Sequence, residues 1–203
     1  MAAPASGGQN KREAIIRAAT TLFGRYGYRR TTVELIAREA RLAKPTLYAH
    51  FEDKDAIFVA VCQAVMDRIV AQARAASAER DAVARLTGVL AAKFTTVFEL
   101  VESSPHAREL LESSDARARD VVAAGDRAFA EVLLSAIKSA AREQAVSLAR
   151  FGGKAATLQS LLMAAGHGAS WGAGSAAEHR AQLGALVRAI IERPAAPRAG
   201  RSR

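Results

Sequence analysis

The residues with the clearest chemical potential lie in one short segment, residues 44–50, with the sequence KPTLYAH. If this segment forms a helix, Leu47 and the following Phe51 point inward and the polar side chains lie on the outer surface. Those polar side chains are Lys44, Thr46, Tyr48 and His50. Such groups can bind phosphates, base edges and thymine methyl groups in a major groove. The segment is therefore a candidate DNA-recognition helix, and Pro45 fits its first turn, where no backbone N–H is needed.

A second short helix is expected just before this segment. Thr31 and Glu34 have the spacing of a capping box, which predicts a helix start at Thr31. The apolar residues that follow recur at helical spacing and form one stripe: Val33, Ile36, Ala37 and Ala40. Residues 41–43 interrupt that stripe. Two short helices joined by a tight turn are thus predicted within about residues 32–51, which is a helix-turn-helix.

The flanking segments complete a three-helix head over residues 11–55. An earlier helix is indicated by the spacing of Ile15, Ala19, Leu22, Phe23 and Tyr26. Gly27 follows them at the position where a left-handed helix cap is expected. After Phe51, Asp53 can cap a long helix whose first turn carries Lys54. A helix N-terminus with a lysine is suited to binding a phosphate.

The segments ATTLFGRYGYRRTTVELIAREA (residues 19–40) and KPTLYAHFEDKDAIF (residues 44–58) resemble the TetR family of transcriptional regulators. The resemblance covers roughly Lys11 to Val61. It implies an all-α protein with an N-terminal helix-turn-helix DNA-binding domain and a helical effector-binding and dimerisation domain over residues 56–192. It also implies that DNA is contacted by the recognition-helix residues Lys44, Thr46 and Tyr48, together with Pro45. The phosphate backbone of the DNA would be contacted by Thr31, Thr32, His50 and Lys54.

Two residues depart from the family pattern. Arg41 replaces a common glycine, and Ala43 replaces a common serine or threonine. A left-handed backbone at a non-glycine residue costs about 1–2 kcal/mol, and a lost helix cap costs about 0.5–2 kcal/mol. Either packing around Leu42 and Leu47 offsets both costs, or Arg41 adds a phosphate contact to the DNA-binding set.

The last two helices, predicted at about residues 154–171 and 176–192, offer a candidate dimer interface. Their apolar stripes comprise Leu158, Leu161, Leu162, Ala165, Ala169, Leu183, Leu186, Val187 and Ile190. Two such helices from each subunit would form a four-helix interface. A two-fold homodimer would place two recognition helices about 34 Å apart, matching a palindromic operator. The alternative is that both stripes complete the internal core.

A regulatory site, if one exists, is expected among the central helices. The bulky or titratable residues that could line an apolar ligand pocket are Phe94, Phe98, His106, Phe129, Met163, His167 and Trp171. Each of them can equally be an ordinary core residue. The family resemblance implies a small-molecule effector that favours a conformation unable to fit the operator.

Charge is distributed unevenly. Residues 1–60 contain ten Lys/Arg against six Asp/Glu, residues 61–192 contain fifteen against fourteen, and the tail adds four arginines. A basic head of this kind should bind DNA with an affinity that falls steeply with salt. Residues 1–10 and 193–203 are expected to be a disordered arm and a disordered basic tail. The single cysteine, Cys62, is expected to be a small buried hydrophobic residue.

The sequence gives little support to the hypotheses of an enzyme, a metal-binding protein or a membrane protein. Residues 168–172 fit a GxSxG pattern, but that motif needs a strand-to-helix turn and the context here is helical. The four histidines are scattered without metal-ligand spacing, so no metal or cofactor is expected. No export signal or membrane span is recognised, and a cytoplasmic location is expected. The leading hypothesis is a ligand-released repressor; the alternatives are a DNA binder without an effector and a protein-interaction module.

Overall fold

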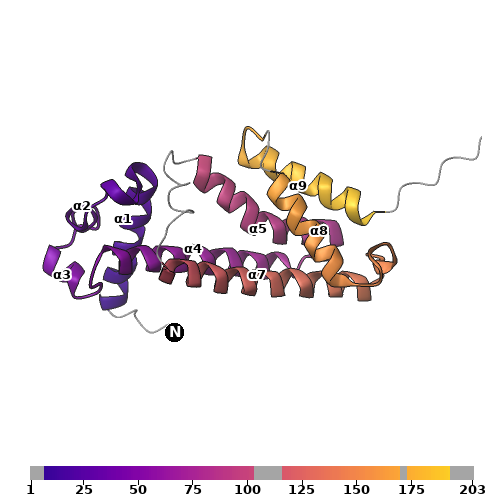
Figure 1. Cartoon of the computed structure of the whole chain (residues 1–203), viewed down its shortest axis with the longest axis horizontal. Helices are drawn as coiled ribbons and strands as arrows, with labels where there is room; N and C mark the ends of the chain where they lie inside the picture. The colour runs from indigo at the N-terminus through magenta and orange to yellow at the C-terminus, as the bar shows by residue number, and fades with distance from the viewer. Residues whose placement is uncertain (1–6, 103–115, 170–172, 193–203) are drawn as a thin grey trace, which may run out of the picture. The chain divides into compact units, whose positions relative to one another are not determined.

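The computed structural model describes residues 7–102, 116–169 and 173–192, and its regular elements there are all helical. The elements are α1 (Gly7–Arg30), α2 (Val33–Glu39), α3 (Lys44–Tyr48), α4 (Lys54–Ala76), α5 (Ala82–Glu102), α7 (Ala116–Arg142), η1 (Leu148–Phe151), α8 (Ala155–Gly168) and α9 (Ala176–Ile191) (Figure 1). The predicted all-α class is confirmed. Residues 7–10, predicted as part of a disordered arm, instead begin α1; residues 1–6 and the tail lie outside the described residues.

The chain divides into two compact units. The first comprises residues 1–72 and 96–129, and the second comprises residues 73–95 and 130–203. This division does not follow the domain boundary predicted after residue 55. The reason is that Ile57, Phe58 and Val61 of α4 are buried in the same apolar cluster as the residues of the head. Hydrophobic burial therefore joins the first part of α4 to the helix-turn-helix.

The core of the first unit is built from the predicted apolar stripes. Its largest members are Ile15, Leu22, Phe23, Ile36, Leu47, Phe51, Ile57 and Phe58, all buried. Val33, Ala40 and Cys62 are partly buried and pack against this cluster. The periodicity of α1 and α2 thus predicted correctly which sides of these helices face inward.

Tyr26 is an exception to that pattern. It was predicted to continue the buried stripe of α1, but it is 40% exposed. Gly27 adopts φ 80° and ψ 164°, a region open essentially to glycine, and breaks the helical phase. Tyr28 consequently takes the inward position, with its ring 5.6 Å from Phe23 and 5.1 Å from Phe58 between centroids.

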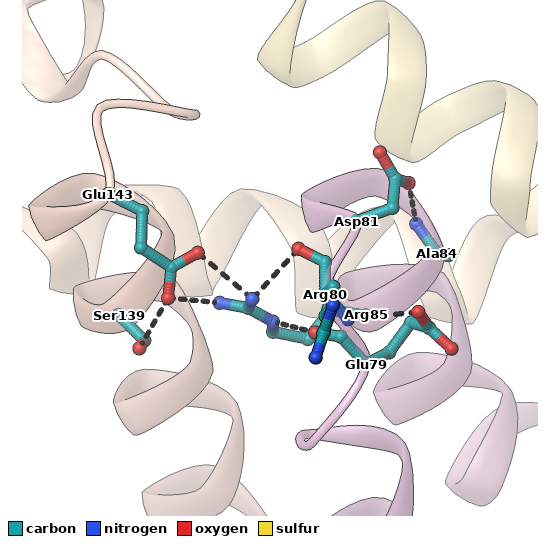
Figure 2. A network of polar contacts seen from close by, with 7 residues as sticks. All are labelled: Glu79, Arg80, Asp81, Ala84, Arg85, Ser139 and Glu143. Atoms are coloured by element: carbon teal, nitrogen blue, oxygen red, sulfur yellow. Dashed lines mark hydrogen bonds and ion pairs between the residues drawn. The ribbon is translucent and has the colours of Figure 1, made fainter.

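The second unit contains a buried guanidinium that ties α5 to the end of α7 (Figure 2). Arg85 Nε donates to the carbonyl of Glu79 at 2.6 Å, and Nη2 donates to the carbonyl of Arg80 at 3.0 Å. Nη1 and Nη2 also donate to the two carboxylate oxygens of Glu143, at 3.0 and 2.9 Å. Hydrogen bonds from Arg85 and Ser139 lower the pKa of the Glu143 carboxyl. This bidentate geometry satisfies a cation whose side chain is only 6% exposed.

A second polar contact lies inside the same unit. His179 of α9 is fully buried, and its Nδ1 lies 3.0 Å from the hydroxyl of Thr95 on α5. Burial lowers the pKa of this imidazole because the charged form loses hydration. The contact links two helices that are far apart in the sequence.

One helix of the described part, α4, meets the length and hydropathy criteria of a membrane span. Core helices of soluble proteins meet the same criteria, and Ile57, Phe58 and Ile69 on this helix are buried within the protein. The apolar composition of α4 is therefore accounted for by packing.

Candidate nucleic-acid interface

The first helix of the candidate interface, α2, begins at Val33. Thr32 is its N-cap, and the Thr32 hydroxyl oxygen accepts a hydrogen bond from the Leu35 N–H at 3.3 Å. The predicted cap at Thr31 is therefore wrong by one residue. Thr31 is buried, and its hydroxyl donates to the carbonyl of Gly27 at 2.8 Å. A side chain held in this way supports the end of α1, so the predicted DNA contact by Thr31 is not supported.

The turn between α2 and α3 has a left-handed residue at its centre. Arg41 adopts φ 56°, as expected for the position at which the family commonly has glycine. The Arg41 N–H donates to the Arg38 carbonyl at 3.1 Å, and the Leu42 N–H donates to the Ala37 carbonyl at 2.9 Å. These two bonds form a Schellman motif, which usually has glycine at the left-handed position. The backbone geometry has been kept here at the cost of steric strain.

The second helix, α3, starts without a side-chain cap. Ala43 occupies the N-cap position with extended backbone angles, and it has no side-chain oxygen to accept from the first turn. Pro45 lies in that first turn, as predicted. The helix ends at Tyr48, with Ala49 as its C-cap, so the prediction that it extends to His50 is wrong by two residues.

The orientation of α3 agrees with the predicted reading surface. Leu47 is fully buried and Phe51 is 5% exposed, as expected. The Tyr48 residue is 45% exposed and the Lys44 side chain is 49% exposed. The Lys44 Nζ lies 5.8 Å from the centroid of the Tyr48 ring, within range of a cation–π contact. A phenol and an ammonium are thus held next to each other on the outer side of the helix.

Lys44 has a partner that the sequence did not indicate. Its Nζ donates to Oε1 of Glu34 on α2, and the Glu34 side chain is 59% exposed. This hydrogen bond raises the pKa of Lys44 and lowers the pKa of the Glu34 carboxyl. The two residues are ten positions apart, and only the turn at Arg41 brings them together.

Lys54 is hydrogen-bonded to the backbone of the head. Asp53 caps α4 as predicted, accepting from the Ala56 N–H at 2.6 Å. The Lys54 Nζ donates to the carbonyls of Tyr28 and Thr31, at 3.0 and 3.1 Å, and lies 4.2 Å from the Tyr28 ring centroid. Burial lowers the pKa of this ammonium. These contacts attach Lys54 to the end of α1, and its contact with a DNA phosphate stays a prediction.

The other predicted contacts are accessible to different degrees. Thr32, Arg41 and Pro45 are exposed, whereas Thr46 and His50 are half-buried. In the part of the chain that the structure describes, no carboxylate pairs with the Arg41 guanidinium. DNA contact by these residues stays a prediction that their exposure permits.

The predicted dimer stripes on α8 and α9 divide into an inner and an outer set. Buried inside the chain are Leu158, Leu162, Ala169, Leu183 and Val187, so these residues belong to the core and their prediction as interface residues is corrected. Leu161 is 45% exposed and Leu186 is 36% exposed, with Ala165 and Ile190 half-buried. The apolar periodicity marked the covered side of each helix, and a few of its members lie on the open side.

The described members of the predicted pocket set are divided between the two units. Phe94 contacts α8 in the second unit: its ring centroid is 4.9 Å from that of His167, and a Cβ on Gly166 would lie 2.2 Å from its Cε2. Met163 is half-buried, and its carbonyl lies 2.8 Å from the His167 Nδ1. Phe98 and Phe129 are buried and belong to the first unit. His106 and Trp171 lie outside the described residues, and the pocket stays a prediction.

Comparison with known proteins agrees with the geometry of the head. Residues 15–61 match the family model for bacterial regulatory proteins of the tetR family. The transcriptional regulator HbdR of Aromatoleum sp. is 42% identical over 59 residues, which are 29% of this chain and 26% of HbdR. The chain therefore spans about a quarter of the length of HbdR, which is one of several curated relatives it matches.

Solved structures extend the likeness to the whole fold. A TetR-family regulator from Rhodococcus sp. has a TM-score of 0.69 and 22% identity, over 91% of this chain and 100% of that protein. FadR of Bacillus subtilis, solved with stearoyl-CoA, has a TM-score of 0.66 and 14% identity, over 88% of this chain and 97% of FadR. These structures are similar to this chain in fold, and residues 15–61 are similar to the helix-turn-helix head of the tetR family.

The strained turn generates a stability prediction. Arg41→Gly should raise the free energy of unfolding by about 1 kcal/mol, because glycine adopts positive φ without a steric penalty. Urea unfolding followed by circular dichroism measures this change. Arg41→Ala is the matched control, since it removes the same charge but keeps the strain, and it should give no comparable gain. Equal stability of the glycine and alanine variants would contradict a strained turn.

Proposed function

We propose that the protein is a sequence-specific DNA-binding transcriptional regulator that acts as a homodimer on a palindromic operator. The observation that carries the proposal is the position of α3, which is fixed to the core by Leu47 while Lys44 and Tyr48 remain exposed. A helix held in this way can enter a major groove without unfolding any part of the head. Thr32, Arg41, Pro45, Thr46 and His50 complete the proposed contact surface.

The proposed contacts have different tasks. Lys44 and Arg41 offer charged donors for phosphates, and Thr32 offers a hydroxyl at a helix N-terminus. Tyr48 and Thr46 offer a phenol, a hydroxyl and a methyl group to base edges. Phosphate contacts fix the orientation of the head, and base contacts decide which sequence is bound.

Binding to DNA is tested with the region upstream of the protein's own gene. Footprinting first identifies the site that the protein protects in this region. Tyr48→Ala should weaken binding to that site about tenfold, which is the loss in affinity expected for one missing base contact. Lys44→Ala should weaken binding to all duplexes, and the slope of log affinity against log salt should become less steep by up to about 0.9. A gel shift at two salt concentrations, with excess unrelated DNA, measures both effects. Tyr26→Ala is the control, because it removes a similarly exposed tyrosine from α1 and should leave DNA binding unchanged. Unaltered binding by the Tyr48 and Lys44 variants would refute the proposal.

We place the homodimer interface on the open sides of α8 and α9. On α8, Thr157, Leu161, Ala164 and Gly168 are exposed at helical spacing. On α9, Leu186 is exposed with Ala185 and Ala189. Small residues around a central leucine allow two copies of these helices to approach closely, and a two-fold axis then presents both heads to one duplex.

Leu161→Glu should convert the dimer to a monomer, because a dimer would bury two uncompensated carboxylates near its axis. Sedimentation velocity measures the change. Leu35→Glu, at a similarly exposed leucine on α2, is the control and should leave the dimer intact. A dimeric Leu161→Glu variant would place the interface elsewhere.

We further propose that the protein is a repressor, located in the cytoplasm and without enzymatic activity, that a small apolar ligand releases from DNA. Stearoyl-CoA, present in the FadR structure, is the first compound to test. An effector should raise the melting temperature and weaken operator binding at the same concentrations, because it stabilises a conformation with lower affinity for DNA. Coenzyme A without an acyl chain is the control. If neither stearoyl-CoA nor a broader set of apolar ligands changes either quantity, the regulator works without such an effector.

A further inference from the structure

The ion pair between Glu34 and Lys44 lies on the surface proposed to contact DNA. Lys44 is the first residue of α3, and Glu34 is in the first turn of α2. The Glu34 carboxylate accepts a hydrogen bond from the Lys44 ammonium, and this bond is the main reason why the pKa of Glu34 is lowered. An acidic group in this position is unexpected on a surface that has to approach phosphates.

The fold has little need of this pair. Both side chains are about half exposed, and exposed ion pairs contribute little to stability because water and salt screen them. The position of α3 is instead fixed by the buried Leu47. The contact between Glu34 and Lys44 can thus break when DNA binds, with little loss of stability of the head.

We propose that Glu34 lowers the affinity of the head for DNA by holding Lys44 in an ion pair that duplex binding has to break. The inference rests on the proposed DNA-binding function and adds a residue that sets its strength. When a phosphate binds Lys44, it replaces Glu34 as the anionic partner of the ammonium. The gain in binding free energy is therefore smaller than it would be for an unpaired lysine. The released carboxylate also remains close to the phosphate and repels it.

The exchange has a consequence for salt dependence. A lysine that neutralises a phosphate releases counterions, which makes affinity fall with salt. The Glu34 carboxylate, once it has lost Lys44, binds cations from solution, and this uptake offsets part of the counterion release. Glu34 should therefore lower the affinity of the head for DNA. It should also make that affinity less dependent on salt than in a head whose basic contact residues are all unpaired.

The experiment uses the full-length protein with two probes: the footprinted operator duplex and a random-sequence duplex of the same length. Glu34→Gln should tighten binding to both by about two- to fivefold for each head in contact, the range of a half-exposed ion pair. The slope of log affinity against log salt should become more negative by up to about 0.9 per head. Glu39→Gln removes the same charge from the other end of α2 and should change affinity by less than about twofold.

A double-mutant cycle tests whether the effect passes through Lys44. In a Lys44→Gln background, Glu34→Gln should tighten binding by less than it does in the wild-type background, because only the repulsion between the carboxylate and the phosphate remains to be removed. An equal gain in both backgrounds, a gain matched by Glu39→Gln, or weaker binding by Glu34→Gln would each overturn the inference. Circular dichroism verifies that the variants are folded. If the wild-type protein binds neither duplex at low salt, the proposed function fails; if it binds and Glu34→Gln does not tighten it, only this inference fails.

Discussion

The burial of Leu47 is the interaction on which the rest of the head depends. A helix of five residues has too few internal hydrogen bonds to persist alone, and α3 is held because Leu47 is inserted into the cluster formed by α1, α2 and α4. Burying a leucine contributes about 1.5–3 kcal/mol. Lys44, Thr46 and Tyr48 take their positions from the helix that this one side chain fixes.

Packing also explains how the turn before α3 tolerates unfavourable local chemistry. Arg41 is left-handed without being glycine, and Ala43 leaves the first turn of α3 uncapped. Both features act against the helix-turn-helix, but Leu42 packs partly against the same core as Leu47. Two apolar anchors on either side of the turn restrict the backbone to one path, so tertiary burial offsets what local propensity lacks.

Two of the ion pairs in the described part of the chain show how environment decides the use of a charge. Arg85 is buried, bonds to two carbonyls as well as Glu143, and therefore ties helices together. Lys44 and Glu34 are half exposed and have fewer fixed partners. Breaking the first pair would leave a guanidinium without hydration, whereas water and ions readily solvate the partners of the second. The first is suited to holding a fold, and the second to exchange with a phosphate.

The sequence by itself determined the helical periods and the inward positions of Leu47 and Phe51, because these depend on neighbours three or four residues apart. It also showed the resemblance of the head to the tetR family. Only the tertiary structure decided that Thr32 and not Thr31 caps α2, that Tyr28 and not Tyr26 packs against the core, and that Lys54 binds carbonyls. It also showed which side of α8 is covered and brought Glu34 to Lys44. A period shows that a helix has an apolar side, but the partner that covers it, and the charges a turn brings together, are set by contacts between distant residues.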